Sequence, residues 1–167
     1  MEIIDKSFIR APRGFLVQSL LAVIVMAVIL IFVQVLTHAA IVAALGASTF
    51  IVFVMPHSLT AQTRNLVGGH IIGLACGAFC YYAFLVGPLG EILGNWDNSL
   101  CCISAIAVGL SIFLMTVTNT EHPPAASTAL GVVVHEWSLQ IILFVLTCAI
   151  CLAIVRRLLR GYLKDLV

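Results

Sequence analysis

Long apolar runs without a formal charge dominate this sequence, and they restrict its fold more than any other feature. The uncharged runs cover residues 15–36, 39–55, 66–87, 100–118 and 139–155. A helix that crosses a bilayer needs about 20 such residues. Hydrophobic residues make up 62% of the chain and charged residues 9%. Soluble domains carry roughly 45–50% hydrophobic and about 25% charged residues. The sequence predicts an all-α integral membrane protein and leaves no room for a soluble catalytic domain.

The basic residues predict how the chain crosses the membrane. Seven of the eight lie in the two terminal segments: Lys6, Arg10, Arg13, Arg156, Arg157, Arg160 and Lys164. The eighth, Arg64, follows the second run. Because Lys and Arg concentrate in cytoplasmic segments, we expect both termini in the cytoplasm of a bacterial inner (plasma) membrane. About six crossings satisfy every basic residue and leave the acidic loop with Glu91 and Asp97 outside. Four crossings would put Arg64 outside.

Two short interrupted segments, near residues 39–55 and 122–136, divide the single transmembrane domain (1–167) into similar halves. The halves are residues 14–90 and 98–160. Each half consists of a long span, a short span and a second long span, and the two halves begin on opposite sides of the membrane. Both short segments contain Ala-Ser-Thr, at 47–49 and 126–128. Corresponding interrupted segments in an inverted 3+3 repeat mark the binding site of many transporters. We therefore expect the site between these two segments.

The proline pair predicts where the second short helix begins. Pro123 and Pro124 favour the first turn of a helix, and we expect the helix to end near Val134. Its roughly 17 Å would cover little more than half of a hydrocarbon core about 30 Å thick. Free N–H groups at the start of such a helix suit a small anion, with Ser127 and Thr128 adding hydroxyl groups. The alternative is that these hydroxyls bond carbonyls of their own or a neighbouring helix.

Four ionisable residues close to the short segments are the remaining candidates for function. Arg64, His70, Glu121 and His122 lie in or near apolar runs, where ionisable groups usually face a cavity or a partner. The alternative interpretation of Arg64 is an ordinary basic residue at the cytoplasmic end of a helix. An unperturbed imidazole titrates near pH 6.5, so His70 and His122, with Glu121, are candidates for proton coupling.

Three glycines spaced by four residues predict close helix packing. Gly69, Gly73 and Gly77 form one stripe, which favours either a contact within the bundle or a seam between copies in a homo-oligomer. The six cysteines lie in apolar surroundings and are interpreted as small hydrophobic residues.

Two motifs resemble those of the HPP family of small integral membrane proteins. The first is the His-Pro-Pro sequence at His122, Pro123 and Pro124. The second is matched by Pro56, Ser58, Ala61, Gln62, Arg64, Asn65, Gly68, Gly69 and His70. Thr63 replaces a usual proline, and Glu121 replaces an Asn that often precedes the His-Pro-Pro. A carboxylate at Glu121 would repel an anion unless it is protonated or turned away.

The resemblance implies a transporter or channel, since chloroplast relatives are associated with nitrite transport. Nitrite or nitrate is then the leading substrate, bound by Ser48, Thr49, Arg64, Asn65, His70, His122, Ser127 and Thr128. Family members are usually described with about four spans, and some carry a CBS pair, which we expect to be absent here. The alternative function is a non-transporting module that senses a ligand or supports a partner. No nucleophile-base spacing, metal-ligand cluster or phosphate loop favours an enzyme, and we expect no cofactor and no nucleic-acid partner.

Overall fold

The computed structural model describes residues 12–33, 39–87, 89–90, 98–135 and 137–166, and its regular elements are all helices. The α-helices are α2 (Pro12–Val33), α3 (Ala39–Val54), α4 (Thr63–Tyr81), α6 (Ser99–Val117), α7 (Pro123–Val134) and α8 (Leu139–Leu159). A 3-10 turn, η1 (Leu59–Ala61), precedes α4, and a π-helical turn, η2 (Tyr82–Val86), follows it. The predicted all-α membrane fold is confirmed. The loop with Glu91 and Asp97 and the basic residues Lys6 and Arg10 lie outside the described residues.

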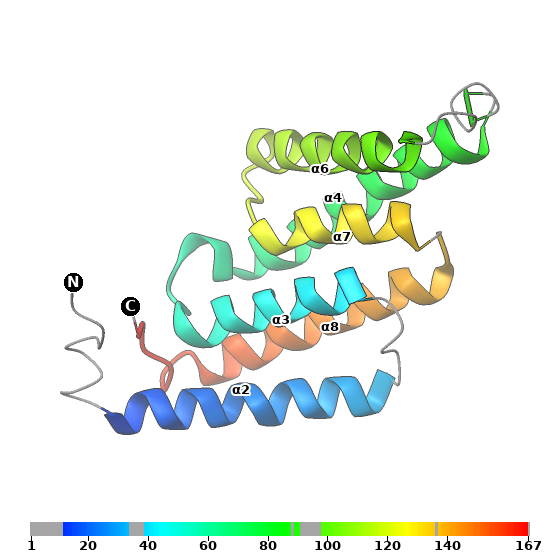
Figure 1. Cartoon of the computed structure of the whole chain (residues 1–167). Coiled ribbons are helices and arrows are strands. Elements are labelled where there is room, and N and C mark those ends of the chain that lie inside the picture. Colours follow the sequence, from blue (N-terminus) through cyan, green and yellow to red (C-terminus); the bar gives the residue numbers. More distant parts are fainter. Residues whose placement is uncertain (1–11, 34–38, 88, 91–97, 136, 167) are drawn as a thin grey trace, which may run out of the picture.

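The six helices alternate in direction, so their connections gather at two ends of the bundle (Figure 1). At one end α2 begins, α3 meets α4, α6 meets α7 and α8 ends. A backbone hydrogen bond from Leu166 N to Val54 O, 2.9 Å long, holds the segment after α8 against the end of α3. Arg13, Arg64, Arg156, Arg157 and Arg160 all lie at this end, which we call the basic end.

The two short helices occupy the middle of the bundle. In Figure 1, α6 and α2 form the two outer edges of the bundle, and α3 and α7 lie between them together with α4 and α8. With 16 and 12 residues, they extend roughly 24 Å and 18 Å, short of a core about 30 Å thick. The described parts of α4 with η2, α6 and α8 are long and apolar enough to span a membrane. The predicted start of α7 at Pro123 and its end at Val134 are confirmed.

The outer surface of the bundle is apolar, as a lipid environment requires. Large side chains are exposed on the outer helices, including Leu16, Val17 and Leu20 on α2 and Phe113 and Val117 on α6. The buried core consists mainly of residues from α3, α7 and α8 with the inner face of α4. A soluble protein rarely exposes so continuous an apolar surface, so this distribution fits a protein whose solvent is the bilayer.

The glycine stripe on α4 is the contact surface for α7. A Cβ atom added at Gly69 would lie 2.6 Å from the Cβ of His122, and one added at Gly77 would lie 2.7 Å from Ala129 O. At Gly73 it would overlap the carbonyl oxygen of Ala125. Since α7 covers all three glycines, they are not available as a seam between copies. The expectation of a homo-oligomer through this stripe is wrong, and the expectation of an internal contact is confirmed.

Candidate functional site: a buried histidine cluster

Four polar side chains meet where α3, α4 and α7 approach one another. We call Ser48 on α3, His70 on α4, His122 before α7 and Thr128 on α7 the buried histidine cluster. Each of the four is 0% exposed, and the imidazole centroids lie 5.1 Å apart. The cluster brings together four residues that the sequence predicts for the site. Each of the two short helices contributes one of them, Ser48 and Thr128.

Hydrogen bonds connect the cluster into a continuous chain. The Ser48 hydroxyl oxygen lies 2.8 Å from His122 Nε2 and 3.1 Å from His70 Nε2. The second nitrogen of His70, Nδ1, lies 2.9 Å from Thr128 Oγ1. The second nitrogen of His122, Nδ1, lies 2.9 Å from the carbonyl oxygen of Thr60 in η1. All four ring nitrogens therefore have partners, as buried polar groups in a bilayer must.

The Thr60 carbonyl determines the proton positions when both imidazoles are neutral. A carbonyl only accepts, so His122 Nδ1 carries the hydrogen and His122 Nε2 accepts. The Ser48 hydroxyl must then donate to His122 Nε2, and its oxygen accepts from His70 Nε2–H. That leaves His70 Nδ1 as the acceptor for the Thr128 hydroxyl. The hydrogen bonds thus run in one direction, from Thr128 to the Thr60 carbonyl.

Ser48 has a second acceptor that gives the cluster an alternative arrangement. Its hydroxyl oxygen lies 2.9 Å from the carbonyl oxygen of Ala44, one turn earlier on α3. If His122 gains a proton at Nε2, the Ser48 hydroxyl can turn to Ala44 while its oxygen accepts from both imidazoles. With one additional proton, every hydrogen-bonding group of the cluster would still have a partner.

The segment before α7 carries the chain into the bundle. Asn119 has a positive φ of 55°, in a region that Asn tolerates better than most residues, and His122 is extended at φ −140° and ψ 94°. Counting 1.5 Å per residue from the ends of α3 and α4, Ser48 and His70 lie roughly 10 Å inside the basic end. The cluster is thus well below the surface of the bundle.

The first three positions of α7 offer fewer free N–H groups than the sequence predicts for an anion. Pro123 and Pro124 occupy its first two positions and have no N–H. The N–H of Ala125 at the third position donates to His122 O at 2.8 Å. The same prolines that open the helix remove two of its donors, and an anion at this helix start stays a prediction.

Arg64 and Asn65 hold the segment before α7 instead of joining the cluster. The exposed Arg64 donates from Nη2 to Thr118 O at 2.8 Å. Asn65 Nδ2 donates to Glu121 O at 3.2 Å and to the Glu121 carboxylate at 3.4 Å. Thr120 packs on Gly68, where an added Cβ would lie 3.0 Å from its methyl group. The Arg-Asn and Gly-Gly parts of the motif therefore both contact the segment before α7, and only His70 belongs to the cluster.

Glu121 is turned away from the cluster. Besides its contact with Asn65, it lines a hollow of about 290 Å³ between α6 and α7, together with Ile112, Met115, Thr116, Pro123 and Ala126. The conflict between this carboxylate and an anion near His122 is thereby reduced.

The remaining predicted hydroxyls lie outside the cluster. Thr49 donates to Leu45 O at 2.9 Å, within its own helix, as the alternative interpretation expects. Ser127 is half-buried and makes no hydrogen bond to the four cluster residues. Of the two Ala-Ser-Thr segments, one supplies its serine to the cluster and the other its threonine.

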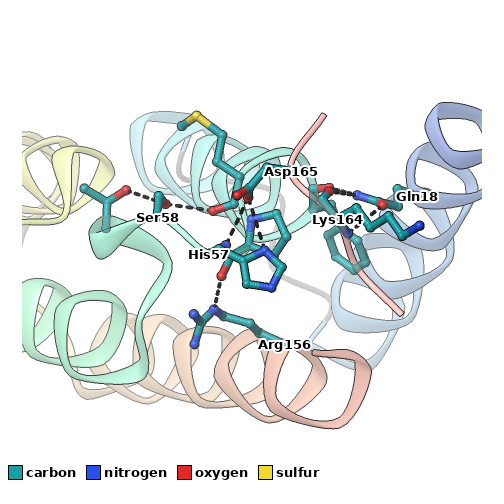
Figure 2. Close-up of polar contacts among 10 residues, drawn as sticks. Gln18, His57, Ser58, Arg156, Lys164 and Asp165 are labelled. Atoms are coloured by element: carbon teal, nitrogen blue, oxygen red, sulfur yellow. Dashed lines mark hydrogen bonds and ion pairs between the residues drawn. The ribbon is translucent and has the colours of Figure 1, made fainter. Parts of the chain in front are cut away.

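Sequence reasoning missed two partners, Thr60 and Gln18. Thr60 contributes a backbone carbonyl, which no residue pattern reveals. Gln18 is a buried amide in α2 that donates to Phe53 O and to Lys164 O, the latter at 2.9 Å, and accepts from Lys164 N at 3.0 Å. Figure 2 shows it joining the C-terminal segment to α2. A polar amide within an uncharged apolar run was the available signal.

Comparison with known proteins gives consistent matches at the sequence level. A profile of the HPP transmembrane region matches residues 9–163. Two curated relatives, both named only as transmembrane proteins of Dictyostelium discoideum, are 39% and 36% identical over 85 residues, or 51% of this chain. The matched parts amount to 27% and 24% of those relatives. No solved structure matches.

Proposed function

The chain belongs to the HPP family of transmembrane proteins, and from that premise we propose that it transports a small inorganic anion across the membrane, nitrite or nitrate being the leading substrates. The observation that carries the proposal is the buried histidine cluster. Ionisable groups inside a membrane are expensive and tend to mark transport pathways. Here they join the two short helices, which is where many transporters hold their substrate.

The arrangement of helices supports an inverted repeat around this site. Suppose that α2, α3 and α4 correspond to α6, α7 and α8. The repeat then exchanges α3 with α7, so the contact between these two helices is equivalent to itself. The contact of α4 with α7 then corresponds to that of α8 with α3, and both are present. Rocking of one half against the other would open the cluster to one side at a time.

Protonation of the cluster gives the anion its receptor. With both imidazoles neutral, every N–H and O–H donor of the cluster is used internally, and no positive charge faces an anion. One added proton creates an imidazolium whose donors an anion can share when α3 and α7 separate. The proposed transport is therefore a joint movement of one proton and one anion. Glu121 lies against Asn65 and takes no part in this step.

The basic end is assigned to the cytoplasm in this proposal. Arg64, Arg156 and Arg160 lie together there, and positively charged residues favour the cytoplasmic side. The anion then reaches the cluster through the segment that Arg64 and Asn65 hold.

The test is anion uptake by the purified chain in sealed proteoliposomes. We expect nitrite and nitrate flux in the natural sequence and its loss in His122→Ala, with insertion intact. Ser111→Ala is the control, because the Ser111 hydroxyl bonds only the Val108 carbonyl of its own helix, at 2.8 Å. Normal flux in His122→Ala would defeat the proposed site, whereas no flux in the natural sequence would defeat transport of these anions.

The second candidate, a non-transporting module that senses a ligand or supports a partner, is favoured by one observation. All members of the cluster are fully buried and paired, as in a purely structural network. Anion binding by the purified protein without movement across a sealed bilayer would select this function.

A further inference from the structure

A hollow at the basic end lies between the end of α8 and the start of α4. Its volume is about 400 Å³, and its lining is formed by His57, Gln62, Thr63, Arg64, Arg156 and Arg160. No residue of the buried histidine cluster contributes to it. The hollow is thus a separate feature, located where the helices reach the membrane surface.

Backbone carbonyls hold two of its three guanidinium groups in place. Arg156 donates from Nε to Pro56 O at 2.8 Å, as Figure 2 shows, and Arg64 donates from Nη2 to Thr118 O at 2.8 Å. Each bond uses one of the five N–H donors of an arginine. Arg160 follows Arg156 by four residues and so lies on the same face of the helix end. Most of the donors around the hollow remain available.

The carboxylates of the described residues leave the positive charge of the hollow unbalanced. Among the described residues, no Asp or Glu forms an ion pair with Arg64, Arg156 or Arg160. Asp165, visible in Figure 2, is engaged by His57, with its Oδ1 3.1 Å from the His57 backbone nitrogen and 3.5 Å from Nδ1. Like charges at the spacing of Arg156 and Arg160 repel each other, and a bound anion would relieve that repulsion.

We propose that this hollow binds a phosphate group. The planar guanidinium fork pairs with two phosphate oxygens at once, and the charge of the three arginines exceeds what a small monovalent anion would neutralise. The position at the helix ends is also the level of lipid headgroups. The phosphate group comes either from a lipid of the same leaflet or from a soluble phosphate compound, and the chemistry of recognition is the same.

The experiment compares two arginines at the end of α8, Arg157 and Arg160, in the whole chain. Arg160→Gln removes a charge that lines the hollow, and Arg157→Gln removes one that does not. Inorganic phosphate is titrated into protein in detergent micelles by calorimetry. Thermal unfolding is then measured in phosphatidylcholine nanodiscs with and without phosphatidic acid, because a bound ligand stabilises the folded state. Unfolding in detergent alone shows that both variants remain folded.

We expect Arg160→Gln to weaken the binding of whichever probe acts on the natural sequence about tenfold, because one charge-assisted hydrogen bond is lost. Arg157→Gln should change this binding less than about twofold. A response to inorganic phosphate identifies a soluble ligand, and a response to phosphatidic acid alone identifies a lipid. Equal losses in both variants, tighter binding of nitrate than of phosphate, or no response to either probe would overturn the proposal. These measurements need no transport activity, so they are independent of the proposed function.

Discussion

The hydroxyl oxygen of Ser48 lies 2.8 Å from Nε2 of His122, although 74 residues separate them in the chain. This contact joins the first short helix to the residue that precedes the second. The same oxygen is 3.1 Å from His70 Nε2, so one hydroxyl group connects three helices. Because Ser48 is 0% exposed, bulk solvent does not compete for these contacts.

Replacing Ser48 with Ala should destabilise the bundle and abolish transport. Both Nε2 atoms of the histidine pair would lose their partner, at about 1–3 kcal/mol for each buried group left unpaired. Thermal unfolding in detergent measures the loss of stability, and uptake into proteoliposomes measures transport. Ser111→Ala is the control, since its hydroxyl bonds only its own helix. Equal melting temperatures for the two variants would contradict the connecting role of Ser48.

Nitrate uptake should increase when the pH on the entry side is lowered. Nitrate stays ionised, so the pH acts on the protein, and protonation of the cluster creates the receptor for the anion. His122→Gln should remove this dependence, because an amide can hydrogen-bond but cannot take up the proton. His135→Gln, at the far end of α7, should retain it. The same pH profile in all three proteins would rule out proton coupling through His122.

Gly73→Ala should destabilise the contact between α4 and α7. The added methyl group would overlap the carbonyl oxygen of Ala125, and overpacking of this kind typically costs about 1–3 kcal/mol. Gly109→Ala on α6 is the matched control, because its Cβ would have no neighbour within 4 Å. There the change should be neutral or stabilising, by up to about 1 kcal/mol. Thermal unfolding of the two variants measures the change in stability. Equal changes in both would show that α7 does not cover the stripe.

Gln18→Leu should release the C-terminal segment from α2. The amide makes two hydrogen bonds with the backbone of Lys164, and a leucine can make neither. Amide hydrogen exchange at 163–166 should accelerate, whereas Gln140→Leu, at an exposed position of α8, should leave it unchanged. Slow exchange in Gln18→Leu would mean that the other bonds, from Leu166 N to Val54 O and from His57 N to Asp165 Oδ1, are enough to hold the segment.

The basic end should be protected from impermeant thiol reagents added outside intact cells. In a cysteine-free background, we expect Asn98→Cys, at the opposite end of the bundle, to be labelled from outside, and His57→Cys to be labelled only after the membrane is opened. Both positions are exposed, so the difference reports orientation. The reverse pattern would place the basic end outside.

Helix boundaries were predictable where a residue type acts through its own backbone. Pro123 determines where α7 begins, and Gly69, Gly73 and Gly77 predict a close contact because glycine has no side chain. The apolar runs predict the other helices, since the bilayer leaves no alternative structure. The division into halves 14–90 and 98–160 stays a prediction.

The composition of the site was less predictable, since contacts depend on depth and direction. Arg64 and His70 are six residues apart, yet Arg64 is exposed at the basic end and His70 is buried. The residue pattern places both in one motif and does not separate them. Nor does it reveal backbone partners such as the Thr60 carbonyl, which sets the tautomer of His122.

The hydrogen bonds between Gln18 and Lys164 have a consequence for biosynthesis. Gln18 belongs to the first described helix, and Lys164 follows the last one, so it is translated after all of the described helices. The amide of Gln18 can reach this partner only after the other helices have been made. The final seating of α2 therefore waits for the synthesis of the segment after α8, and a chain stalled before Leu163 would enter the bilayer with this helix only partly anchored.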